Sequence, residues 1–250
     1  MKDCIVIIPT YNEIENIEAI IREVLSQKSE AGIPFFDMMI VDDGSPDGTA
    51  QKVMELQQEF PDRIHLEQRK GKLGLGTAYI HGFKIALEKG YEYICEMDAD
   101  FSHRPTDLVQ LYLACVEQGY DLAVGSRYSN GVTVINWPIG RVLMSYFASW
   151  YVRFITGMSI MDTTAGFKCY RGKVLKNIEL DKIKFIGYAF QIEMKFLTWK
   201  YGFKIVEVPI IFQDRMKGVS KMSTKIFKEA FLGVIQMKIS SLFRTFHQKI

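Results

Sequence analysis

The sequence predicts an α/β domain built on a mostly parallel sheet flanked by helices. Two observations carry this prediction. Short apolar runs alternate with longer amphipathic runs over the first half of the chain, and four of the short runs end in a cluster of polar residues. Strands that alternate with helices form parallel sheets, and such sheets bind ligands beyond the carboxyl ends of their strands. The polar clusters therefore favour a ligand site along one edge of the sheet.

Each expected element follows from the spacing of its apolar residues. Continuous short apolar runs predict strands, whereas apolar residues three and four positions apart predict helices. The strands of the first half are expected at residues 4–8, 38–41, 64–66, 93–97 and 122–124. The helices between them are expected at residues 14–25, 49–60, 77–88 and 107–117.

The second half of the chain is less regular. The pattern predicts an aromatic-rich helical region at 137–155, strands at 167–170 and 205–212, a helix at 189–199 and a long amphipathic helix at 221–245. The sequence contains no internal repeat and no long linker. The 250 residues are therefore expected to form a single domain over 1–228, with a basic amphipathic C-terminal helix at 222–250.

Composition and charge exclude several classes of protein. With 48% hydrophobic and 24% charged residues, the chain is neither disordered nor of low complexity. Residues 1–60 carry 12 acidic and 4 basic side chains, whereas residues 215–250 carry 8 basic side chains and one acidic side chain. The basic end suggests a membrane surface or phosphate groups as partner, although a solvated helix face gives the same pattern. No nucleic-acid partner is expected.

The longer apolar stretch and the cysteines indicate a chain that works in a reducing compartment without crossing a bilayer. The uncharged part of the aromatic region, residues 142–152, has 11 residues, which is the length of a buried or interfacial helix. The four cysteines form no CxxC pair and no zinc-finger spacing. Cys4 and Cys95 lie in apolar runs, so we expect buried thiols.

Asp98 and Asp100 follow an apolar strand directly. Carboxylates two positions apart in an extended chain point the same way, and paired carboxylate oxygens suit Mg²⁺ or Mn²⁺ bridged to phosphates. A polar turn that caps a helix is the alternative. Asp42 also ends a strand, where its carboxylate can bind a nucleobase or ribose, or can form an Asx turn before the next helix with Ser45 or Asp47 as cap.

Cationic side chains near these strand ends suggest anion binding. Lys72 and Gly74 belong to a glycine- and lysine-rich segment, residues 70–76, that opens a helix without matching a phosphate-binding loop or a dinucleotide fingerprint. Four further cations lie at loop or helix edges, where together they would neutralise phosphates, although each taken singly fits a surface charge better. These cations are Arg127, Arg141, Arg215 and Lys221.

Three motifs, in order, resemble those of glycosyltransferase family 2. They are IIPTYNE at residues 7–13, VDDGSPDGT at 41–49 and MDADFSHRP at 97–105. Within that family the chain is most similar to the dolichyl-phosphate (polyprenyl-phosphate) β-mannosyltransferases. That closer similarity rests on GSRY at 125–128, WPIGR at 137–141, DTTAGFK at 162–168 and the segment 209–221.

The resemblance implies a GT-A fold and a role for each site residue. It implies that the nucleoside is held by Pro9, Tyr11, Glu13 and Asp42. It implies that Asp98 and Asp100 hold Mg²⁺ or Mn²⁺ and the diphosphate, with Asp100 and the four cations named above as the catalytic group. Some relatives have a metal-coordinating Gln where this chain has Ser102, which puts a third protein ligand in doubt.

The implied reaction is the inverting transfer of mannose from GDP-mannose to dolichyl or polyprenyl phosphate. The acceptor phosphate is already anionic, so no strong general base is required. Residues 137–157 would form an amphipathic helix at the bilayer surface. The chain resembles a short form of the family, which is peripheral on the cytosolic face of a membrane or anchored by a small partner subunit.

Three alternatives remain open from the sequence. The same fold can transfer glucose or N-acetylglucosamine from a UDP-sugar to polyprenyl phosphate. A glycan-extending transferase with a hydroxyl acceptor would need a carboxylate base, for which Asp162 or Glu193 is available. A non-catalytic membrane-associated scaffold is the third, and the intact carboxylates and cations argue against it.

Overall fold

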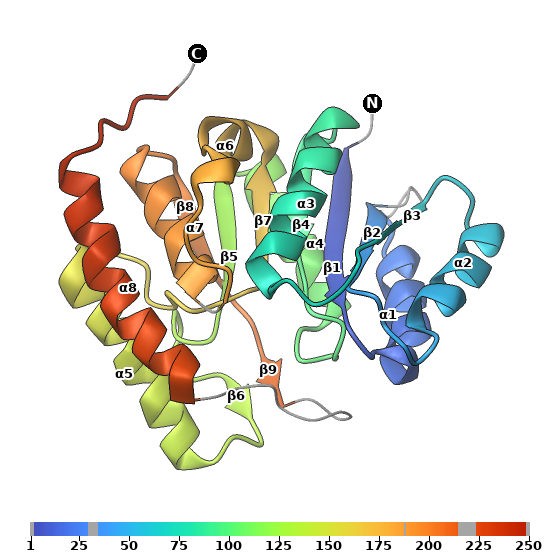
Figure 1. The fold of residues 1–250 in the computed structure, drawn as a ribbon, viewed down its shortest axis with the longest axis horizontal. Helices are drawn as coiled ribbons and strands as arrows, with labels where there is room; N and C mark the ends of the chain where they lie inside the picture. Colours follow the sequence, from blue (N-terminus) through green and yellow to red (C-terminus); the bar gives the residue numbers. More distant parts are fainter. Residues whose placement is uncertain (1–2, 30–34, 188, 215–223, 249–250) are drawn as a thin grey trace.

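The protein is described by a computed structural model that covers residues 3–29, 35–187, 189–214 and 224–248. Its centre is a seven-stranded sheet in the order β3-β2-β1-β4-β7-β5-β8 within these residues (Figure 1). All neighbouring strands run parallel except β7, which is antiparallel to β4 and β5. The strands are β1 Cys4–Thr10, β2 Phe36–Asp42, β3 Ile64–Gln68, β4 Tyr93–Glu96, β5 Leu122–Ser126, β7 Lys168–Arg171 and β8 Ile205–Pro209.

Helices cover both faces of the sheet because its strands are apolar on both sides. One core contains residues from α1 (Ile14–Ser26), α2 (Thr49–Glu59) and α4 (Pro105–Val116). The core on the other face contains residues from α3 (Leu75–Glu88), α6 (Gly172–Asn177) and α7 (Ala189–Lys200). The prediction of a mostly parallel sheet between helices is confirmed.

A smaller subdomain lies beside the sheet. It contains α5 (Ile139–Thr156), α8 (Thr224–Leu242) and the two-stranded sheet of β6 (Val134–Ile135) and β9 (Phe212–Gln213), while a short 3₁₀ helix, Leu180–Lys182, precedes α7. Helix α8 runs next to α5 in Figure 1, and the two contact each other. Their shared core includes Val152, Phe185, Phe196, Val234 and Met237.

The expected elements are present, with shifted ends. The strand expected at 205–212 is wrong as one strand, because the chain leaves the main sheet after Pro209 and Phe212 then donates its N–H to Thr133 beside β6. The helix expected from 137 begins at Ile139, after Pro138. The helix expected at 221–245 ends at Leu242, and its expected start lies outside the described residues. The sequence analysis missed α6 and β6.

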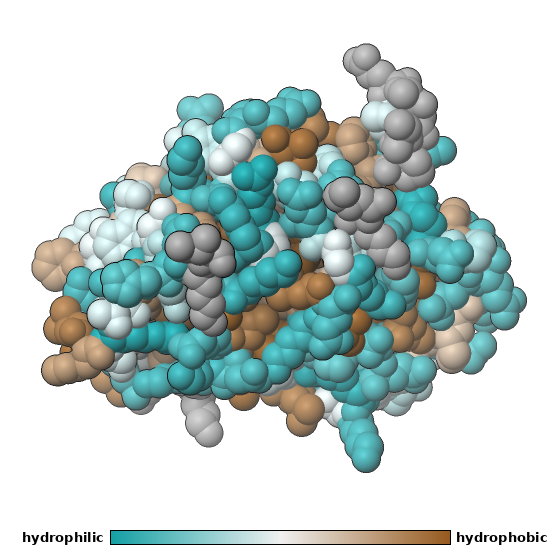
Figure 2. All heavy atoms as spheres, turned by 90° about the horizontal axis from the view of Figure 1, so that it is seen from above, coloured by the Kyte–Doolittle hydropathy of each residue, from teal (hydrophilic) through white to brown (hydrophobic). Residues whose placement is uncertain are grey.

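No helix in the described ranges combines the length and apolar character that crossing a bilayer needs. Figure 2 views the molecule from the end at which β1 begins, and that face is largely hydrophilic, with apolar side chains showing in the recesses. All four cysteines are free and buried, as expected.

Candidate active site

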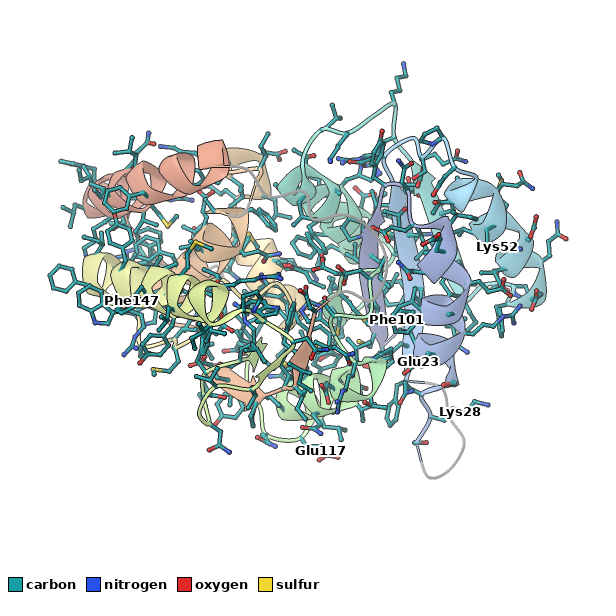
Figure 3. The ribbon with its side chains drawn as sticks, turned by 90° about the horizontal axis from the view of Figure 1, so that it is seen from below. Glu23, Lys28, Lys52, Phe101, Glu117 and Phe147 are labelled. Atoms are coloured by element: carbon teal, nitrogen blue, oxygen red, sulfur yellow. The ribbon has the colours of Figure 1, made fainter. Side chains whose placement is uncertain are left out.

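The polar clusters of the sequence meet at the end of the sheet where β1, β2, β4 and β5 terminate. This end is the lower one in Figure 1, and Figure 3 views it from below. A pocket of about 580 Å³ opens here, between the sheet and the helices α5 and α8. Its polar lining consists of Asp98, Asp100, Ser102, His103, Arg127, Arg141, Ser145, Thr164, Gln191 and Asp214.

Asp98 and Asp100 both line this pocket, as the sequence predicts. The backbone N–H of Ser102 donates to Asp100 Oδ1 over 3.1 Å, and the Tyr79 hydroxyl donates to Asp98 Oδ1 over 3.5 Å. A local turn is therefore present together with the two carboxylates at the pocket wall, but it does not cap α4, which has no side-chain cap hydrogen bond.

The donor set at these two aspartates fits a hard divalent cation such as Mg²⁺ or Mn²⁺. Among the described residues, no third carboxylate or imidazole joins them in a cluster tight enough for one ion. This agrees with Ser102 standing where some relatives have a Gln. A bound phosphate or water could supply further ligands.

His103 is a pocket residue that the sequence analysis missed. Its ring stacks on Phe167 at 4.7 Å between centroids and meets Phe212 edge-on at 5.2 Å. Burial lowers the pKa of His103 to about 4, and Arg127 adds to that effect while Asp100 opposes it. The imidazole is therefore neutral at physiological pH. The signal that could have identified it is its position close to Asp98-Ala99-Asp100, which is called a DxD motif.

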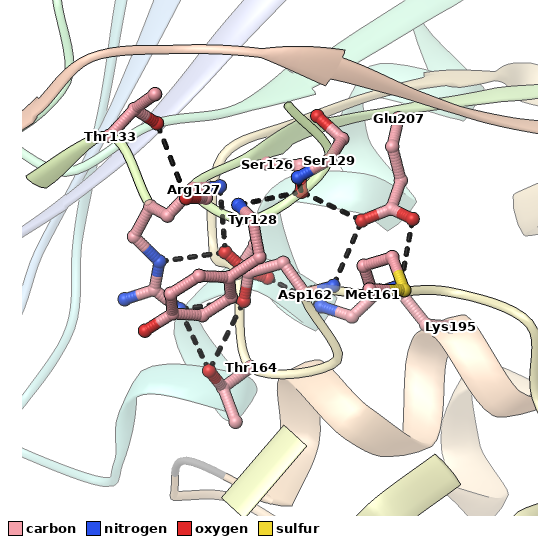
Figure 4. A network of polar contacts seen from close by, with 11 residues as sticks. Ser126, Arg127, Tyr128, Ser129, Thr133, Met161, Asp162, Thr164, Lys195 and Glu207 are labelled. Carbon is pink, nitrogen blue, oxygen red and sulfur yellow. Dashed lines mark hydrogen bonds and ion pairs between the residues drawn. The ribbon is translucent and has the colours of Figure 1, made fainter. Parts of the chain in front are cut away.

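Arg127 lies at the pocket in a buried ion pair with Asp162 (Figure 4). Its Nε and Nη2 donate to the two oxygens of Asp162 over 2.7 Å each, and Nη2 also donates to the Thr164 hydroxyl over 2.8 Å. Figure 4 shows the remaining nitrogen, Nη1, directed away from Asp162. Although burial opposes ionisation of the Asp162 carboxyl, the Arg127 charge holds its pKa below the usual value.

The guanidinium groups of Arg141 and Arg127 both lie near the ring of Trp137. The Trp137 ring centroid is 4.1 Å from the Arg141 guanidinium carbon and 5.5 Å from that of Arg127. Arg141 also forms an ion pair with Asp214 over 2.9 Å, and both side chains are about one-third exposed (32% and 33%). The structure therefore brings two of the four predicted cations together. Arg215 and Lys221 lie outside the described residues.

The residues expected to hold the nucleoside lie at the adjoining ends of β1 and β2. Asp42 is buried and accepts hydrogen bonds from the Thr10 hydroxyl (2.9 Å), the Ser45 N–H (2.9 Å) and the Ser45 hydroxyl (2.5 Å). This is the Asx-turn alternative of the sequence analysis. The helix start at Thr49 is held by Asp47, which accepts its backbone N–H over 3.1 Å.

The lysine- and glycine-rich segment joins this nucleoside side. Lys72 Nζ lies 5.2 Å from the centre of the Tyr11 ring, and the half-buried Pro9 lies in β1. Glu13 accepts a hydrogen bond from the Asn16 amide over 3.0 Å. Gly74 has φ of 104°, and a Cβ there would lie 3.1 Å from the carbonyl oxygen of Ile186. The positive φ and this close contact with the backbone together favour glycine at position 74.

The two carboxylates considered as general bases are both engaged in the structure. Asp162 is ion-paired with Arg127. Glu193 accepts the backbone N–H groups of Lys184 and Phe185 over 3.0 Å each, and burial raises its pKa despite these bonds. A hydroxyl acceptor that needs a base therefore gains no support from this site.

The apolar lining of the pocket comes mostly from α5 and α8, with Ile192 from α7, although α5 also contributes the polar Arg141 and Ser145. The apolar residues from these helices are Met144, Phe147, Ala148, Trp150, Tyr151, Val152, Ile192, Phe231 and Val234. Tyr151 and Phe231 connect α5 to α8, since their rings stack at 4.4 Å and the Tyr151 hydroxyl donates to the Phe231 carbonyl. The pocket thus combines charged and apolar side chains in its lining.

A cluster of thiols lies away from the pocket, in the core of the sheet. The Sγ atoms of Cys4, Cys95 and Cys169 lie within 4.8 Å of one another, with 3.7 Å between the first two. Burial raises the pKa of all three well above the usual value. The thiols are therefore neutral and pack as small apolar groups.

Comparison with known proteins agrees with this geometry. The family model for glycosyl transferase family 2 matches residues 5–178. The chain belongs to glycosyltransferase family 2. It is 46% identical over 235 residues to polyprenol monophosphomannose synthase of Mycolicibacterium smegmatis, covering 94% of this chain and 86% of that protein. It is 43% identical to undecaprenyl-phosphate mannosyltransferase of Micrococcus luteus, covering 94% of this chain and 93% of that protein.

Solved structures confirm the GT-A fold. Glucosyl-3-phosphoglycerate synthase from Mycobacterium tuberculosis, in complex with Mn²⁺, UDP and glucosyl-3-phosphoglycerate, superposes with a TM-score of 0.65 at 15% identity. The superposition covers 96% of this chain and 79% of that one. The same enzyme with Mg²⁺ and UDP gives a TM-score of 0.66 at 16% identity, also over 96% and 79% of the two chains. As a member of the family, the present chain is a glycosyltransferase, so the scaffold alternative is set aside.

Proposed function

We propose that this glycosyltransferase transfers mannose from GDP-mannose to a polyprenyl phosphate, with inversion at the sugar carbon. The observation that carries the proposal is the mixed lining of the pocket, which combines the charged Asp98, Asp100, Arg127 and Arg141 with apolar side chains of α5 and α8. Such a site suits an amphiphile with a phosphate head and an apolar tail. The names of the two curated relatives add support for mannose and for a polyprenyl acceptor.

The residues suggest how the reaction is promoted. An oxygen of the acceptor phosphate attacks C1 of the mannose, and the bond from C1 to the GDP oxygen breaks. Arg127 and Arg141 neutralise phosphate charge and align the two reactants, which is the main catalytic contribution available here. A Mg²⁺ or Mn²⁺ ion held by Asp98 and Asp100 would stabilise the negative charge of the departing diphosphate.

The engagement of both candidate bases fits an anionic acceptor. Asp162 and Glu193 are both committed to partners within the chain, as described above. A phosphate nucleophile is already deprotonated, so it needs no proton acceptor. The nucleoside would lie at the neighbouring strand ends, surrounded by Pro9, Tyr11, Glu13, Asp42, Lys72 and Gly74.

The same proposal includes a membrane partner. Helix α5 exposes Ile139 (73%), Phe147 (59%), Trp150 (54%) and Phe154 (72%), which is the pattern of an interfacial helix. The enzyme would sit peripherally at the cytosolic face of a membrane and take its acceptor from there. A small anchoring subunit is a further possible component.

A transfer assay read by mass spectrometry tests the proposal. The purified protein, with Mg²⁺ or Mn²⁺ and a short-chain polyprenyl phosphate, is offered GDP-mannose, UDP-glucose or UDP-N-acetylglucosamine separately. Mannosyl-phosphoryl lipid from GDP-mannose alone is the expected result. Product from a UDP-sugar would replace the donor and keep the acceptor. Lack of product from every donor, with acceptor in detergent and in liposomes, would contradict the proposal.

A further inference from the structure

Besides Asp162, a second carboxylate side chain holds the segment that carries Arg127. It lies outside the pocket. Glu207 lies on β8, next to β5, and is not among the described residues that line the pocket. Its Oε1 accepts the Ser126 hydroxyl over 2.7 Å and the Asp162 N–H over 2.8 Å. Its Oε2 accepts the Met161 N–H over 2.7 Å. One side chain thus joins two loops that are about 35 residues apart in the sequence.

The bonds continue from Glu207 to both sides of Arg127 (Figure 4). Ser126 Oγ, while donating to Glu207, accepts the N–H groups of Tyr128 over 3.3 Å and Ser129 over 3.1 Å. On the other side, Asp162 accepts the backbone N–H of Arg127 over 3.0 Å besides its side-chain donors. The backbone before and after Arg127 and the carboxylate that aligns its guanidinium are therefore all fixed by the same group.

We propose that Glu207 is a positioning residue that sets the direction of the Arg127 guanidinium toward the pocket, acting through Ser126 and Asp162. The inference rests on the proposed function, since Arg127 is taken to meet a substrate phosphate. Glu207 suits this role because a carboxylate accepts three donors without supplying one. Gln at this position brings an NH₂ group against N–H donors, so at least one of the three bonds is lost.

A double-mutant cycle tests whether Glu207 acts through Arg127. Transfer rates are measured for the wild type, Glu207→Gln, Arg127→Ala and the double variant, with kcat and KM determined for donor and acceptor separately. We expect Glu207→Gln to lower kcat by roughly 10- to 100-fold in the wild type and by less than about 2-fold in the Arg127→Ala background, because groups that act as a unit are not additive. Equal factors in both backgrounds would overturn the proposal.

Glu193→Gln is the matched control. Glu193 is also a carboxylate that accepts two backbone N–H groups, from Lys184 and Phe185, and it does not contact Arg127. Its substitution should change kcat by the same factor whether or not Arg127 is present. Ser126→Ala, which removes a single hydroxyl, repeats the cycle if Glu207→Gln fails to fold.

A measurement without substrate separates this proposal from the proposed function. Hydrogen exchange of the Arg127 Nε–H, followed by NMR, reports its bond to Asp162 whether or not the enzyme turns over. Exchange should accelerate at least about 10-fold in Glu207→Gln and stay unchanged in Glu193→Gln. Unchanged exchange in Glu207→Gln would overturn the positioning role. Faster exchange without transfer from any donor would refute only the proposed function.

Discussion

Asp100 and Arg127 both lie at the buried end of the pocket, yet their charges have different surroundings. Arg127 forms an ion pair with Asp162 within the chain over 2.7 Å. Asp100 accepts a backbone N–H from Ser102 and lines the pocket next to Asp98. Two neighbouring carboxylates at a cavity wall repel each other unless a cation binds there, which fits the proposed role of Asp98 and Asp100 in holding a divalent ion.

Replacing Asp100 with Asn should abolish turnover, with a loss of at least about 100-fold. The amide keeps the shape of the side chain but removes the negative charge that attracts the divalent ion. The affinity for GDP in the presence of Mn²⁺, measured by calorimetry, should fall together with the rate. Asp181→Asn is the control, because Asp181 is exposed and pairs with Lys84. Near-normal turnover in Asp100→Asn would contradict the metal role.

The sequence predicted which charged residues lie near the pocket, but it did not predict which residues pair with the arginines. The Asp98 and Asp100 pair was identifiable because both residues closely follow one strand, so their position at the edge of the sheet is a local property of the chain. The arginines were predicted to bind phosphates, but their partners Asp162 and Asp214 lie 35 and 73 residues further along the chain. No local spacing indicates which carboxylate such a cation will meet.

At the scale of elements, α8 depends on close packing against the segment before α7. Gly233 faces Phe185, and a Cβ added at this glycine would lie 2.6 Å from the Phe185 ring. Buried Val234 and Met237 continue the same contact, whereas Leu232, Ile239 and Leu242 on the opposite side are exposed. One face of α8 is therefore packed on the core, and the other is exposed.

Gly233→Ala should destabilise the protein by about 1–3 kcal/mol through overpacking, even though Ala is the better helix former. Urea unfolding measures the difference. Gly140→Ala serves as control, because no atom lies within 4 Å of a Cβ at Gly140 in α5, and it should be neutral or slightly stabilising. A Gly233→Ala protein as stable as the wild type would show that α8 is not held at this point.

The exposed stripe of α5 should bind the membrane. Replacing Ile139 and Phe154, which do not line the pocket, with Ser should weaken co-sedimentation with anionic liposomes by about 10-fold or more, since each buried apolar side chain contributes about 1.5–3 kcal/mol. Turnover of a soluble short-chain acceptor should be retained. Met54→Ser with Val116→Ser, at two apolar residues (37% exposed each) on α2 and α4, is the control. Equal binding by both variants would contradict this role of α5.

For the whole molecule, His103 links the pocket to the pH dependence of stability. Its pKa in the folded protein is about 4, below the ordinary 6.5, because burial disfavours the charged ring. Between these values the unfolded chain binds a proton that the folded protein does not bind. Stability should therefore fall as the pH drops from about 6.5 to about 4, by about 2 kcal/mol at pH 5.

His103→Phe should flatten this part of the stability curve, because Phe keeps the stacking on Phe167 but does not titrate. Urea unfolding at pH 7.5 and pH 5 compares this variant with the wild type. His247→Gln, at an exposed histidine, should retain the wild-type dependence. A His103→Phe variant as pH-sensitive as the wild type would show that another group controls the acid limb.

The sequence by itself determined the alternation of strands and helices, the position of Asp98 and Asp100 just after a strand, and the burial of Cys4 and Cys95. Each of these follows from the periodicity of neighbouring residues, because apolar spacing selects the element and its inner face. The similarity of ordered motifs added the family, which the comparisons confirm.

Only the tertiary structure decided how the charges are paired and what closes the pocket. The Glu207 bonds to Ser126 and Asp162 span 81 and 45 residues, and the stacking of Tyr151 on Phe231 joins helices 80 residues apart. The same reason explains the antiparallel β7, which enters the sheet between two strands that precede it in the sequence. Contacts of this kind depend on where whole elements pack, and the residues nearby in sequence do not specify that.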